Sequence, residues 1–128
     1  MFYDGSRSKW LSVETFMLTF GRNGTTASAS YFRGVDSLVY SSTRGHRANN
    51  NGTVVALQYT RSDSDSVPLE VTADGNTVAS VTSAAVAGGS NTLNGNFSAG
   101  AVLGARVGSS GGNAADNVIG HVLCRWRA

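Results

Sequence analysis

The sequence predicts a single all-β domain over residues 1–128, folded as an antiparallel sandwich or closed barrel of about eight to ten short strands. Short apolar runs alternate with clusters of Gly, Asn, Ser and Asp at the spacing of such folds, and no run has the period of a helix. Hydrophobic residues make up 41% of the chain and charged residues 14%, which excludes a disordered segment. A chain of 128 residues can also bury a core without disulfides or metals.

The first half of the chain predicts two long strands. The first covers 11–20 and stops at a Gly-Arg-Asn-Gly turn, and the second covers 52–61, where β-branched and aromatic residues dominate. Between them we expect only two short apolar strands, at 31–33 and 38–40. The segments predicted as polar loops are 25–30 and 41–52.

A β-hairpin is the strongest local signal in the second half. Asp74-Gly75 supplies the positive φ angles of a type I′ turn between strands predicted at 67–73 and 77–81. In the first of these strands apolar and polar residues alternate, which indicates one buried face. The remaining strands are expected at 93–97, 102–107 and 118–126, with loops at 84–91 and 108–117.

Two of the predicted strands, 54–59 and 118–126, are apolar on both faces. A strand in an isolated antiparallel sandwich has one polar face, and no helix is available to cover a second apolar one. We therefore expect a neighbouring subunit to cover these strands, with three copies packed around an axis. The residues predicted at this trimer interface are Val55, Leu57, Tyr59, Leu123 and Trp126.

The charge pattern favours protein partners. The formal charge is +2, and Lys9 is the only lysine beside nine arginines. Arginine is enriched and lysine depleted at protein interfaces, and the scattered basic residues form no stripe for nucleic acid. The opening residues predict no signal peptide, and no apolar run reaches membrane length, so we expect no membrane partner.

Residues that could carry catalysis are few, and the sequence predicts a non-enzymatic protein without metal or cofactor. Cys124 lies within an apolar run and is predicted to be buried. His121, three residues earlier on the same strand, points to the opposite face, so the two cannot form a nucleophile–base pair. Asp63 and Asp65 resemble part of a calcium loop without its glycine and closing glutamate, which leaves a weak cation site as an open question.

Both tryptophans lie near a chain end and beside basic residues. Trp10 follows Arg7 and Lys9, and Trp126 lies between two arginines. Tryptophan with arginine is typical of interface anchors, although large aromatic residues also fill cores. The residues predicted to contact a partner are Arg7, Lys9, Trp10, Arg44, His46 and Arg47.

Several segments resemble structural proteins of tailed bacteriophages, in the expected order over most of the chain. The overall layout is also similar to the trimeric jelly roll of the complement and tumour-necrosis-factor type. The segments that carry the resemblance are Phe2–Ser12, Asn51–Ser62, Leu69–Gly75, Leu93–Gly100 and Arg125–Arg127.

The resemblance implies a jelly-roll virion protein. It implies a homotrimeric decoration (cement) protein that is made in the host cytoplasm, binds the major capsid protein on the outer capsid surface and stabilises contacts between capsid subunits. An alternative is the tip of a tail or head fibre that binds a host glycan or protein, although the chain opens directly on the module without a shaft. A third reading is a monomeric carbohydrate-binding sandwich with exposed aromatic residues on one sheet face.

Overall fold

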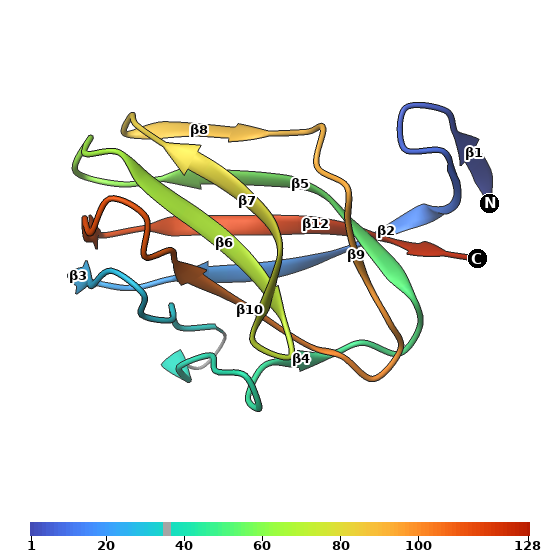
Figure 1. The fold of residues 1–128 in the computed structure, drawn as a ribbon, viewed down its shortest axis with the longest axis horizontal. Coiled ribbons are helices and arrows are strands. Elements are labelled where there is room, and N and C mark those ends of the chain that lie inside the picture. The colour runs from blue at the N-terminus through green and yellow to red at the C-terminus, as the bar shows by residue number, and fades with distance from the viewer. Residues whose placement is uncertain (35–36) are drawn as a thin grey trace.

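The computed structural model describes residues 1–34 and 37–128, and these residues form antiparallel strands and no helix (Figure 1). None of the described residues forms a helix that is long and apolar enough to cross a membrane. The strands of the described residues are β1 (Phe2–Asp4), β2 (Lys9–Gly21), β3 (Thr25–Thr26), β4 (His46–Arg47), β5 (Gly52–Thr60), β6 (Val67–Ala73), β7 (Asn76–Ser83), β8 (Ala87–Ser90), β9 (Gly95–Phe97), β10 (Val102–Val107), β11 (Ala115–Asp116) and β12 (Ile119–Arg127).

Two larger sheets make up the fold. One has the order β1-β2-β12-β5-β8, with β9 also paired to β5, and the other has the order β4-β10-β6-β7. A two-stranded piece, β11 and β3, joins two loops. The last strand, β12, lies between β2 and β5, so it pairs directly with the first long strand of the chain.

The core lies between the two larger sheets, which gives the fold its sandwich-like character. In the six-stranded sheet, Val122 is paired with Leu18 on one side and with Leu57 on the other, and all three are buried. In the four-stranded sheet, Leu69 and Val107 form the equivalent buried pair. All five belong to one hydrophobic cluster. The alternation predicted for 67–73 is confirmed over its first five residues, because Val67, Leu69 and Val71 are buried and the two residues between them are partly exposed.

The Asp74-Gly75 hairpin is confirmed. Asp74 and Gly75 have φ angles of 51° and 83°, as a type I′ turn requires, and Ala73 pairs with Asn76 across the turn. The Asp74 carboxylate also accepts a hydrogen bond from the Val102 amide at 2.9 Å. The turn therefore ties the β6–β7 hairpin to the start of β10.

The segments predicted as strands at 31–33 and 38–40 form only isolated bridges. Tyr31 bridges to β10 and Arg33 bridges to the end of β2, so this segment closes the edge between the two sheets. Tyr40 is buried there, and its hydroxyl donates to the Thr19 carbonyl at 2.6 Å. The backbone of this segment is irregular because it pairs with a strand of each sheet in turn.

The loop predicted at 84–91 is wrong, because β8 forms within it and pairs with β5. Glycine explains the error. A Cβ at Gly89 would lie 2.2 Å from the Leu57 carbonyl oxygen, so the close approach of the two backbones needs a residue without a side chain. Short strands also lie within three other predicted loops, as β3, β4 and β11.

Candidate functional site

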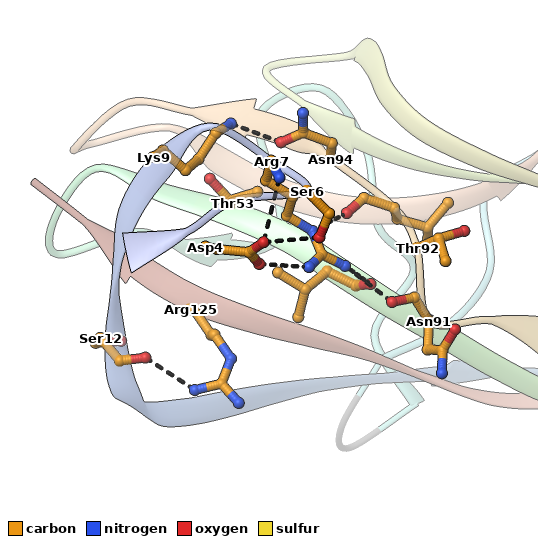
Figure 2. A network of polar contacts seen from close by, with 12 residues as sticks. Asp4, Ser6, Arg7, Lys9, Ser12, Thr53, Asn91, Thr92, Asn94 and Arg125 are labelled. Atoms are coloured by element: carbon orange, nitrogen blue, oxygen red, sulfur yellow. Dashed lines mark hydrogen bonds and ion pairs between the residues drawn. The ribbon is translucent and has the colours of Figure 1, made fainter. Parts of the chain in front are cut away.

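The N-terminal hairpin, defined as residues 2–11 and containing β1 and the start of β2, is fixed by Arg7 (Figure 2). The Arg7 guanidinium donates to the Asp4 carboxylate at 2.6 Å and to the carbonyls of Leu93, Asn91 and Val55 at 2.6, 2.8 and 3.1 Å. Hydrogen bonds from Arg7 and then from Ser6 hold the pKa of Asp4 below its ordinary value. The Arg7 side chain thus binds its own chain.

Lys9 is bound within the chain in the same way. Its ammonium donates to the Oδ1 atoms of Asn94 and Asn96, both at 2.6 Å, and the buried Thr53 hydroxyl donates to the same Asn96 oxygen. Burial, followed by the nearby Arg127 and Arg7 charges, lowers the pKa of Lys9. Arg7 and Lys9, both predicted to contact a partner, thus hold the hairpin against the β8–β9 region through bonds within the chain.

Trp10, in contrast, is free to contact a partner. It is 54% exposed and lies directly across from Tyr3, which is also 54% exposed. Their rings pack edge to face with centroids 5.6 Å apart. In the neighbouring cross-strand pair, formed with Leu11, Phe2 lies beneath the Arg125 guanidinium, 5.2 Å from ring centroid to Cζ. Tyr3 is not among the residues predicted to contact a partner. Its place beside Trp10 follows from the register of the β1–β2 pairing.

The other predicted contact residues, Arg44, His46 and Arg47, are exposed and lie together on β4 and the loop before it. His46 and Arg47 pair with the start of β10, and the Arg47 Nε donates to the Gly100 carbonyl. Figure 1 shows β4 and β1 at separate places in the molecule. The six predicted contact residues therefore do not form one site.

Four of the five residues predicted at a trimer interface are packed within the chain, which corrects that assignment. Leu57, Tyr59 and Val55 are buried, with the first two in the main core. Trp126 packs against the core and stacks on Phe16, with ring centroids 4.2 Å apart. Both faces of β5 are apolar because the core covers one face and the hairpin covers part of the other.

Leu123 is the exception, because it lies on the outward face of the six-stranded sheet. It pairs with Met17 and with Ala56, so the three side chains share this face. Ile119 is 73% exposed, Val13 is 71% exposed and Met17 is 57% exposed. We call Val13, Met17, Ile119 and Leu123 the open face. In the sequence, this face is indicated by the apolar residues at outward positions of the predicted strands 11–20 and 118–126.

A groove of about 540 Å³ opens at the Ile119 end of this face. Met17, Ile119 and His121 line it from the sheet, and Arg22 and Arg33 line it from neighbouring segments. The groove is therefore continuous with the open face and adds polar groups at its edge.

Cys124 is buried in the core, as predicted. Burial raises the pKa of its thiol to about 12, which keeps it protonated and unreactive at neutral pH. His121 lies on the outward face with Thr19 and Gln58, whereas Cys124 pairs with the buried Val54. The two residues therefore point in opposite directions.

Asp63 and Asp65 lie beside an internal cation. The buried Arg61 guanidinium donates to the Asp63 carboxylate at 2.8 Å, to the Ser83 hydroxyl at 2.7 Å and to the Asp65 carbonyl. Burial favours a raised pKa for Asp63, but bonds from the Asp116 amide and from Arg61 outweigh it and hold the pKa below its ordinary value. Arg61 thus supplies the positive charge that this loop binds.

Within residues 1–34 and 37–128, no group of three or more His, Cys, Asp or Glu side chains is arranged to hold a metal ion. No protein-family model, no curated protein and no solved structure matches this chain.

Proposed function

We propose that this protein is a non-enzymatic structural protein of a bacteriophage virion. In this proposal it forms a homotrimer, binds the major capsid protein on the outer capsid surface and stabilises contacts between capsid subunits. The observation that carries the proposal is the open face, where three large apolar side chains are more than half exposed. Exposed apolar residues that share a face are typical of protein–protein contacts.

The strand order supports a jelly roll. From β2 to β12, apart from the β3–β11 pair, successive strands alternate between the two larger sheets except at the β6–β7 and β8–β9 connections. The last strand pairs with the first long one, as a jelly roll built from two Greek keys would also require. Jelly rolls are common among virion proteins, so this order fits the proposed role.

The trimer in this proposal packs through the open face. Met17, Ile119 and Leu123 replace Leu57 and Tyr59 as the contact residues, because the latter two fill the core of the chain itself. A trimer contacts several capsid subunits at once, so modest contacts add up through effective concentration. Assembly and capsid binding are therefore linked.

Rebinding to phage heads from which the protein has been removed tests the proposal. The wild-type chain should rebind, and Met17→Glu should lose rebinding because it places a charge in the proposed trimer contact. Val86→Glu is the matched control, because Val86 is 55% exposed and lies just before the edge strand β8, two strands from β12. Failure of the wild-type chain to rebind, or equal rebinding by Met17→Glu, would overturn the proposal.

A fibre tip that binds a host glycan or protein is the second candidate, and the groove favours it. Its volume of about 540 Å³ is within the range of small-ligand sites, and Arg22, Arg33 and His121 provide hydrogen-bond donors beside apolar walls. Glycan-array binding that Arg22→Ala abolishes, without any binding to heads, would support this candidate over the first.

A further inference from the structure

The N-terminal hairpin carries a second exposed apolar group, separate from the open face. Met1, Phe2, Tyr3 and Trp10 are 63%, 38%, 54% and 54% exposed. Tyr3 and Trp10 are an edge-to-face pair across the β1–β2 ladder and present both rings to solvent. Exposed tryptophan and tyrosine are the side chains that most often anchor protein contacts.

The hairpin holds these rings in place. Arg7 binds three carbonyls from segments that lie 48 to 86 residues away in sequence. Lys9 binds the side chains of Asn94, which Figure 2 shows, and of Asn96 on β9. Because the hairpin is tied at its turn through Arg7 and at the start of β2 through Lys9, little conformational entropy remains to be lost when a partner binds the rings. Rigid aromatic residues of this kind supply contact area at low entropic cost.

The same end of the molecule carries a surplus of positive charge. Residues 1–12 and 125–128 contain four basic side chains, Arg7, Lys9, Arg125 and Arg127, and one acidic side chain, Asp4. This surplus of three exceeds the formal charge of +2 of the whole chain, so the other residues together carry −1.

Only Arg7 of these four basic groups has an acidic partner among the described residues. The Arg125 guanidinium binds the Ser12 and Val13 carbonyls, and the Arg127 guanidinium binds the Gly52 and Phe97 carbonyls. Neutral oxygens satisfy their donors without cancelling their charge. The remaining residues of a second copy carry a net charge of only −1, so the surface of a more acidic protein is the better complement.

We propose that the N-terminal hairpin is a docking surface for an acidic protein surface, on which an apolar side chain packs against Tyr3 and Trp10. This deepens the proposed function, on which it rests, by assigning the face of the trimer that meets the capsid. Single-stranded nucleic acid fits less well. The two rings are 62° apart, so successive bases cannot stack on both.

A peptide of alternating glutamate and leucine is the probe, with a lysine–leucine peptide and a thymidine oligonucleotide as controls. The wild-type chain should bind the acidic peptide, and binding should weaken as NaCl rises from about 0.05 M to about 0.5 M. Trp10→Ser should weaken it about tenfold. Val86→Ser, which removes an equally exposed apolar side chain elsewhere, should leave it unchanged. Equal binding by Trp10→Ser, binding that ignores salt, or tighter binding of the oligonucleotide would overturn the inference.

Head rebinding separates this inference from the proposed function. If Trp10→Ser rebinds heads as well as the wild-type chain does, the capsid function stands and the hairpin inference falls. If the wild-type chain binds the acidic peptide through Trp10 but never binds heads, the docking surface stands and the capsid function falls.

Discussion

The two ends of the outward face of the six-stranded sheet have opposite surroundings. At one end the N-terminal hairpin lies over the sheet, and Leu11, Val55 and Thr53 are buried although none of them belongs to the main core. At the other end Met17 and Ile119 are more than half exposed. The same strands, β2, β5 and β12, run through both ends.

The difference shows how one apolar sheet face can be covered in two ways. The hairpin end is covered by the chain itself and fixed by polar bonds. The donors of Arg7 and Lys9 therefore bind acceptors within the chain. The open end has no cover within the described residues, and we infer that other copies provide it. A two-sided apolar strand therefore predicts a cover, without specifying whether that cover is the chain or a partner.

The largest effect separates the inner and outer faces of the sheet. Leu57→Ala should lower the free energy of unfolding by about 2–5 kcal/mol, because it leaves a cavity in the core. Met17→Ala should change the free energy of unfolding of the monomer by less than about 0.5 kcal/mol, because Met17 is exposed. Denaturant titration in dilute solution measures both. Similar losses in the two variants would contradict the assignment of the faces.

The next effect tests the cover at the hairpin end. Arg7→Ala removes all four contacts of the guanidinium and should lower the free energy of unfolding by about 1–3 kcal/mol. Hydrogen exchange of residues 2–11 should accelerate more than exchange of β6 and β7. Arg44→Ala is the control, because Arg44 is exposed. Unchanged exchange of the hairpin in Arg7→Ala would show that other contacts hold it.

Thiol labelling distinguishes neighbouring positions on β12. Cys124 is buried and its pKa is raised to about 12, so the native wild-type chain should react slowly and the unfolded chain rapidly. The Leu123→Cys thiol in a Cys124→Ala background points outward and should react rapidly under conditions where the chain is monomeric. Fast native labelling of Cys124 would place β12 in a different register.

The smallest effect is the pH dependence of the hairpin. The pKa of Asp4 is lowered from 3.8 by its bonds to Arg7 and Ser6, so its carboxylate stabilises the fold above that value. This contribution is lost as the pH falls through the lowered pKa, because the protonated group no longer pairs with Arg7. Asp4→Asn should remove that part of the acid dependence of hairpin exchange. An identical pH profile in both proteins would exclude the pair as its source.

Much of the fold could be predicted from the sequence, because apolar alternation and turn residues determine long strands and the Asp74-Gly75 hairpin. β8 could not, because its glycines pair by close backbone approach and leave no apolar signal. The site was predicted least well. The sequence marks Arg7 and Lys9 as charged and near a terminus, but only the fold shows that the carbonyls and amides they bind come from residues about 50 to 90 positions away.

The mass of the native protein in solution tests the central claim most directly, which is that copies of the chain cover the open face. Light scattering of the wild-type chain should give three times the 13.2 kDa mass of one chain, and Met17→Glu should give a folded species of 13.2 kDa. A wild-type protein that stays a stable monomer over a broad range of concentration, with Met17 and Ile119 left in solvent, would contradict the claim.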